Sequence, residues 1–163
     1  MKKHDLRFMT QAAMIAAIYV VLTVLLRPFS YGEVQVRISE MLTILPFFTP
    51  AAVPGLFVGC ILANILGGAV LPDIIFGSLA TLIGAVFTYM LREKDMKLAV
   101  IPPIVSNALI VPFVLRYAYG VQLPIILMVG TVGLGEVISC GILGLLLGKT
   151  LEKRRSVIFG SAE

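Results

Sequence analysis

Glu136 and Asn107 are the polar residues whose positions most clearly suggest ligand chemistry. Glu136 lies in VGTVGLGEVISCG and Asn107 lies in PPIVSNALIVPF, and each segment is otherwise mostly apolar. Counting about 1.5 Å per helical residue places both side chains near the middle of a membrane span. An ionisable group at that depth costs about 2.5–3.5 kcal/mol on insertion scales and normally faces a cavity or a partner. A carboxylate and an amide at this depth can bind a ligand, although an interhelical packing role for Glu136 stays open.

Four further polar residues are candidates for the same site. Arg37 and Glu40 are three residues apart, which places them on one face if the helix has already begun, and they could form a local ion pair at the outer membrane interface. Asp73, in LPDIIFG, occupies a position typical of a helix N-cap, and Asn64 could serve in helix packing. Glu33 is assigned to the polar loop ahead of them. The candidate substrate-binding residues are therefore Glu136, Asn107, Glu40, Arg37, Asp73 and Asn64.

Residues that support enzyme, metal or cofactor chemistry are scarce in this sequence. The one histidine, His4, is in the N-terminal tail, and Cys60 and Cys140 are isolated within apolar runs. GLLLGKT has three residues between Gly144 and Gly148, where a nucleotide-binding loop needs four. We therefore expect no catalytic residue, no metal, no cofactor and no ATP site within the chain.

The composition indicates an all-α integral membrane protein. The chain of 163 residues is 59% hydrophobic and 13% charged, whereas a soluble domain is about one quarter charged. We expect one domain, 1–163, with about six transmembrane helices. Pro46, Pro50 and Pro54 leave open whether the second and third are separate helices or one broken helix. The expected spans are 8–26, 40–48, 51–66, 73–91, 98–116 and 123–149.

The distribution of basic residues predicts the orientation in the membrane. Six spans put both termini on one side, and all but Arg27, Arg37 and Arg116 of the 13 lysines and arginines lie there. Because basic residues are retained in the cytoplasm, both termini should be cytoplasmic. This makes the chain a multi-pass protein of the cell membrane, and it accounts for the net charge of +4 without nucleic-acid binding.

A stripe of small residues lies near the cytoplasmic end of the first span. Ala12 and Ala16 are four residues apart, as are Ala13 and Ala17. This spacing lets helices approach closely in lipid. The stripe could pack inside the protein or dock another membrane protein, and by general frequency internal packing is favoured.

VRISEMLTILPFFTPAAVPGLFVGCILANILGG resembles the queuosine-precursor transporter (QueT) family, the substrate-binding S components of energy-coupling-factor (ECF) transporters. The similarity continues through LPDIIFGSLATLIGA, PPIVSNALIVPF and GLGEVISCGILG. The resemblance implies six helices with a site that opens outward. It also implies a transmembrane scaffold subunit and two cytoplasmic ATPase subunits as partners. In this family an alanine-rich motif in the first helix docks on the scaffold, so the resemblance reverses the preference for internal packing of the alanine stripe.

The ligand implied by the resemblance is a 7-deazaguanine precursor of queuosine, in its aminomethyl or cyano form, or queuine. We expect Glu136 or Glu40 to bind the guanine edge and Asn107 to assist. Two alternatives stay open. One is an S component for another vitamin or heterocycle. The other is a stand-alone permease in which Glu136 is coupled to protons.

Overall fold

The computed structural model describes residues 3–26 and 37–154, and every regular element in these ranges is helical. Two of the elements are not α-helices: η1 is a 3₁₀-helix and η2 is a π-helix. Residues 27–36, which include Glu33, and the basic residues Lys2 and Arg155 lie outside the described ranges. The elements are α1 (Lys3–Leu25), η1 (Ile38–Phe47), α3 (Ala52–Leu66), α4 (Leu71–Met90), α5 (Met96–Ala99), α6 (Ile101–Tyr117), α7 (Ile125–Glu136), η2 (Val137–Leu143) and α8 (Gly144–Glu152).

The helices group into four long membrane spans and two shorter apolar helices. The long spans are Asp5–Leu25, Leu71–Met90, Met96–Tyr117 and Ile125–Glu152, and each is long enough to cross a bilayer of about 30 Å. The third span joins α5 to α6, and the fourth joins α7, η2 and α8. The prediction of an all-α, multi-pass membrane protein is therefore confirmed.

The proline-rich region forms two separate helices, which answers the question that the sequence left open. Pro46 lies inside η1, and Pro54 lies in the first turn of α3. The short connection between the two helices includes Pro50. Because η1 has 10 residues, it is too short to cross a membrane by itself. It packs instead against α4, α8, η2 and α1 inside the bundle.

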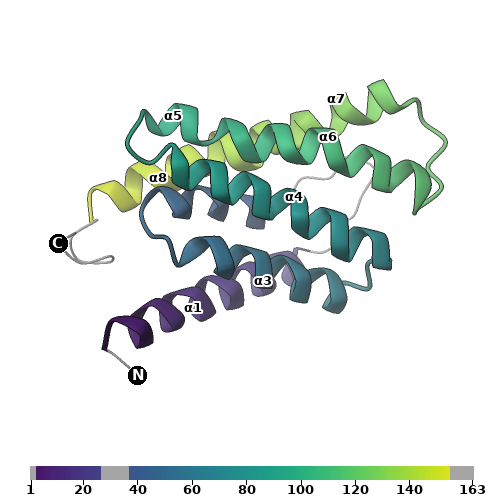
Figure 1. Ribbon diagram of the computed structural model, residues 1–163. Coiled ribbons are helices and arrows are strands. Elements are labelled where there is room, and N and C mark those ends of the chain that lie inside the picture. The colour runs from purple at the N-terminus through teal and green to yellow at the C-terminus, as the bar shows by residue number, and fades with distance from the viewer. Residues whose placement is uncertain (1–2, 27–36, 155–163) are drawn as a thin grey trace.

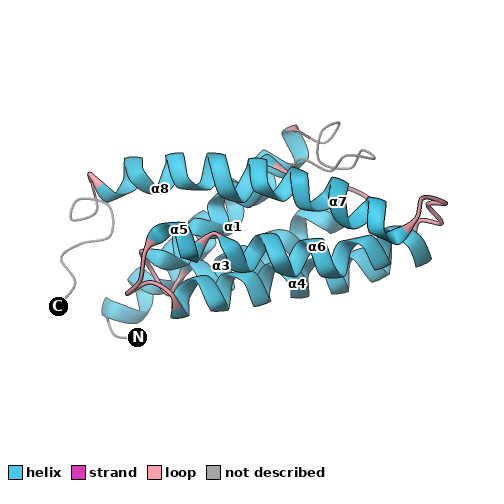
Figure 2. Cartoon of the chain, turned by 90° about the horizontal axis from the view of Figure 1, so that it is seen from above, coloured by secondary structure: helices cyan, strands magenta, loops and turns pink. Residues whose placement is uncertain are grey.

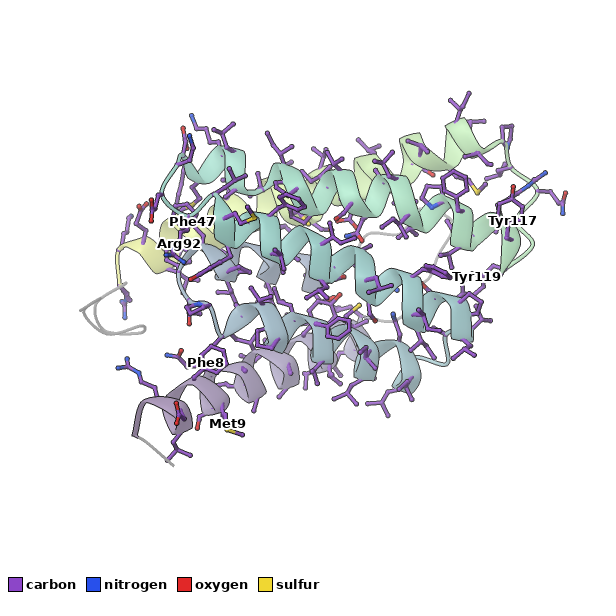
Figure 3. All side chains as sticks on the ribbon, in the orientation of Figure 1. Phe8, Met9, Phe47, Arg92, Tyr117 and Tyr119 are labelled. Atoms are coloured by element: carbon purple, nitrogen blue, oxygen red, sulfur yellow. The ribbon has the colours of Figure 1, made fainter. Side chains whose placement is uncertain are left out.

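The long helices run side by side along one direction (Figures 1 and 2). The start of α1, the turn from α4 to α5 and the end of α8 lie at the same end of the bundle, while the connection from α6 to α7 lies at the opposite end. Figure 3 labels Arg92 at the first end and Tyr119 at the other. That the first end faces the cytoplasm stays a prediction from the charge distribution.

Glycines hold α1 and α3 in close contact. A Cβ atom added to Gly55 would lie 2.7 Å from the backbone oxygen of Ala12, and one added to Gly59 would lie 3.0 Å from the Cα of Ala16. Lipid gives no hydrophobic drive for helix association, so close backbone packing of this kind stabilises the pair. Ala12 and Ala16 thus pack inside the protein, whereas Ala13 and Ala17 are exposed.

Apolar and polar side chains are distributed as expected for a protein surrounded by lipid. Large hydrophobic side chains such as Leu62, Phe76 and Ile126 are exposed on the outside of the helices. Charged side chains of η1, α4 and α7 are buried inside the bundle. Such residues at membrane depth usually face a cavity or one another, so they define where a site should be sought.

Replacing Gly55 by alanine should lower the thermal stability of the detergent-solubilised protein. The added methyl group collides with the backbone of α1, and overpacking of this kind costs about 1–3 kcal/mol. Gly130→Ala is the matched control, because no atom lies within 4 Å of a Cβ added there. A melting temperature for Gly55→Ala equal to that of Gly130→Ala would contradict the close contact between α1 and α3.

Candidate functional site

A group of buried polar side chains lies where five helical segments meet, and we call it the central polar cluster. Its members come from α1, η1, α4, α6 and the α7–η2 junction. All of them are nearly inaccessible to solvent. Three of them, Glu40, Asn107 and Glu136, are candidates from the sequence, and the fold brings these three together. The cluster consists of Tyr19, Glu40, Thr43, Thr81, Asn107, Glu136 and Cys140.

Glu40 is held at one oxygen and leaves the other without a partner. Its Oε1 atom accepts a hydrogen bond from the hydroxyl of Tyr19, and Thr81 Oγ1 lies 3.4 Å from the same atom. Its Oε2 atom is buried and has no hydrogen-bond partner within the described residues. A buried carboxylate oxygen without a donor is energetically costly, so this atom is suited to a ligand donor.

Glu136 lies directly against Glu40. Its Oε2 atom accepts a hydrogen bond of 3.1 Å from Cys140 Sγ, and Thr43 Oγ1 lies 3.3 Å from that sulfur. A carboxylate oxygen of each acid and the Cys140 sulfur all lie within 4.8 Å of one another. Donor atoms this close could bind a cation, either a metal ion or a positively charged group of a ligand.

Asn107 adds a hydrogen-bond donor to the two acids. Its side chain is 3% exposed and interacts with both Glu40 and Glu136. Its Nδ2 atom nevertheless makes no hydrogen bond that satisfies ordinary distance and angle limits among the described residues. The cluster thus holds a buried acceptor, Glu40 Oε2, and a buried donor, Asn107 Nδ2, and neither makes a well-formed hydrogen bond.

A second polar group, the arginine cluster, adjoins the central one and consists of Arg37, Asn64, Asp73 and Tyr119. Arg37 Nη2 donates to Asn64 Oδ1 at 3.0 Å and lies 3.8 Å from Asp73 Oδ2. The hydroxyl of Tyr119, in the connection after α6, donates to Asp73 Oδ2 at 2.8 Å. Partial burial, together with the nearby Asp73 carboxylate, raises the pKa of Tyr119 to about 12. This phenol therefore stays protonated and keeps the connection tied to α4.

Two interpretations of charged residues need correction. Asp73 is not an N-cap: Val70 occupies that position, and Asp73 is buried between Arg37 and Tyr119. Arg37 and Glu40 do not lie at a water-facing edge, because their side chains are 6% and 1% exposed. The chain folds η1 into the bundle, and there Arg37 forms an ion pair with Asp73.

Cys60 lies between the two clusters. Thr81 Oγ1 is 3.5 Å from its sulfur, and Asn64 Nδ2 is 3.7 Å from it. Sequence analysis did not propose Tyr19, Thr81 or the cysteines as site residues. A signal existed for Tyr19, which shares a helix face with Ala12 and Ala16.

The backbone at the central polar cluster is irregular on two sides. η1, which carries Glu40, is a 3₁₀-helix of 10 residues, although such runs seldom exceed four. η2, which carries Cys140, is a π-helix that begins immediately after Glu136. The two segments contact each other. Short π-helical segments occur frequently at functional sites, so this backbone agrees with the polar side chains in marking the place.

Comparison with known proteins gives a family and a relative. The family model described as "QueT transporter" matches residues 9–153. The chain is similar to a protein of Lactococcus lactis subsp. cremoris (strain MG1363) named "Queuosine precursor transporter QueT", with 38% identity over 85 residues. That match covers 51% of this chain and 50% of the relative, so the chain spans about half the length of this curated relative. No solved structure matches.

Proposed function

Because this chain belongs to the QueT transporter family, we propose that it is the substrate-binding S component of an ECF transporter and binds a queuosine precursor at its central polar cluster. Membership of this family and the apolar helices make it a multi-pass transport protein of the cell membrane. The ligand would be a 7-deazaguanine, in the aminomethyl or cyano form, or queuine.

The unused hydrogen-bonding atoms of Glu40 and Asn107 are the observation that carries the proposal. A guanine-like ring presents two adjacent N–H donors and a carbonyl oxygen. One carboxylate can accept both donors, and an amide N–H can donate to the carbonyl. Glu40 Oε2 can accept one of these donors, Oε1 can accept the other where Thr81 now lies at 3.4 Å, and Asn107 Nδ2 can donate to the carbonyl.

Ligand entry would involve the arginine cluster. Tyr119 ties the α6–α7 connection to Asp73, and Arg37 and Asn64 lie between this contact and Cys60. The Tyr119 end of the bundle is the one that we expect to face outward. Arg37, Asp73 and Asn64 would thus line the route to the cluster or contact the ligand during its passage.

The energy for transport would come from partners, namely a transmembrane scaffold subunit and two cytoplasmic ATPase subunits. We assign docking on the scaffold to α1. In the apolar stretch of this helix, 22% of the residues are buried inside the protein, which is the smallest share among the four long spans. Ala13 and Ala17 are exposed, so they leave a shallow surface on which another helix can pack closely, while Ala12 and Ala16 support α1 from inside.

Substituting Glu136 should weaken ligand binding. We expect the purified chain, alone in detergent, to bind 7-aminomethyl-7-deazaguanine in a calorimetric titration and to reject riboflavin. Glu136→Gln should lower the affinity by about tenfold or more, since it removes a charged acceptor from a buried site. Glu93→Gln is the matched control, because the Glu93 side chain is exposed.

Two results would contradict this assignment. Absence of binding by a folded chain would remove the proposed ligand class, and unchanged affinity in Glu136→Gln would return this residue to a packing role. Proton-driven uptake by the isolated chain in liposomes would favour the stand-alone permease instead.

Enlarging Ala17 should separate docking from ligand binding. Ala17→Leu places a bulky group on the exposed face of α1 and should reduce co-purification with the scaffold, while ligand affinity in calorimetry stays unchanged. Gly130→Leu adds the same side chain on an exposed position of α7 and serves as the control. Equal co-purification of both variants with the scaffold would contradict docking through α1.

A further inference from the structure

We infer that, among queuosine precursors, this site selects those that carry a cationic amine, and that Glu136 binds the ammonium group. The inference rests on the proposed function, because it specifies the charge of the ligand at the same site. It follows from the charges of the buried residues and from the different partners of Glu40 and Glu136.

Negative charge exceeds positive charge inside the bundle. Glu40, Asp73 and Glu136 are buried acids, and among the residues described in the structure Arg37 is the one buried basic side chain. Three carboxyl groups thus stand against one guanidinium, which lies 3.8 Å from Asp73. The adjacent carboxyl groups of Glu40 and Glu136 repel each other unless a proton or a cation lies between them, and a cationic ligand can take the place of that proton.

The surroundings of the two acids differ in a way that assigns their roles. Arg37 lies three residues before Glu40 in the chain, whereas the charged side chain grouped within 4.8 Å of Glu136 is the acid Glu40. Glu136 is therefore the acid that most lacks a positive partner. The position of Glu40 supports binding of a neutral edge of the ligand, since part of its charge is already offset.

The hydrogen bonds lead to the same division. Glu40 Oε1 is bound by the hydroxyl of Tyr19, which fixes the carboxylate and leaves Oε2 for the guanine edge. Glu136 Oε2 receives a hydrogen bond from the thiol of Cys140, and a thiol is a weak donor. An ammonium group, with three strong donors, can displace or supplement that contact.

The members of the ligand class differ in the required charge. A primary amine on a methylene carbon is protonated at neutral pH, as is the lysine side chain, and the secondary amine of queuine behaves similarly. A nitrile carries no proton and presents a lone pair. It would place that lone pair against a carboxylate oxygen, which is a repulsive contact.

The test compares three ligands of similar size. The complete chain is titrated calorimetrically, in EDTA, with the 7-aminomethyl, 7-hydroxymethyl and 7-cyano derivatives of 7-deazaguanine. We expect the aminomethyl compound to bind at least about tenfold more tightly than either neutral compound, since it alone places a positive charge beside Glu136. The hydroxymethyl compound separates the effect of charge from that of shape.

Two variants assign the roles of the acids. In Glu136→Gln the aminomethyl compound should lose about tenfold or more in affinity, while the neutral compounds change by less than about threefold. In Glu40→Gln all three compounds should weaken by similar factors, because the guanine edge is common to them. Equal weakening of all three in Glu136→Gln would overturn the assignment of the ammonium to Glu136.

The wild-type titration decides the inference even if a variant fails to fold. Binding of the cyano or hydroxymethyl compound as tight as that of the aminomethyl compound would overturn the charge selection and leave the proposed function standing. The aminomethyl titration is repeated without EDTA, and binding that occurs only there would overturn the inference too, because a metal ion would then be supplying the positive charge. Failure of all three compounds to bind a folded chain both with and without EDTA would refute the proposed function itself.

Discussion

Two carboxyl groups share a small volume inside an apolar bundle, and the rest of the site is arranged around them. An oxygen of Glu40 and one of Glu136 lie within 4.8 Å of each other, with almost no solvent exposure. Burying one such group is costly, and burying two in contact adds repulsion unless a proton or cation lies between them. The hydroxyl of Tyr19, the thiol of Cys140 and the nearby Arg37 reduce this cost without removing it. A polar or cationic ligand would supply what is missing.

The fold meets this constraint by bringing short, irregular helices to the centre. η1 enters the bundle as a 3₁₀-helix and carries Glu40, and η2 is a π-helix directly after Glu136. Around these segments the regular helices approach closely through glycines, as α1 and α3 do at Gly55 and Gly59. Regular helices thus provide the membrane-spanning frame, and irregular ones provide the site. This division agrees with the general association of π-helical segments with function.

Hydropathy and charge predicted the membrane-spanning helices well, but they predicted the residues of the site only in part. The long apolar runs gave the spans, because lipid requires continuous apolar helices of that length. The rarity of acids at membrane depth pointed to Glu136. The pairing of Arg37 with Asp73 could not be predicted, since it joins η1 to α4 across the bundle and depends on how η1 folds inward. Thr81 gives no signal in the sequence, because threonine is common in membrane helices without such a role, and the signal for Tyr19 is only its place on the helix face of Ala12 and Ala16.

A structure of the chain with a bound 7-deazaguanine tests the central claim most directly. The account predicts that the ring lies among Glu40, Asn107 and Glu136, and that Glu40 Oε2 and Asn107 Nδ2 both gain hydrogen-bond partners from the ligand. A ligand bound elsewhere, with these two atoms still lacking partners and the carboxyl pair unchanged, would contradict it.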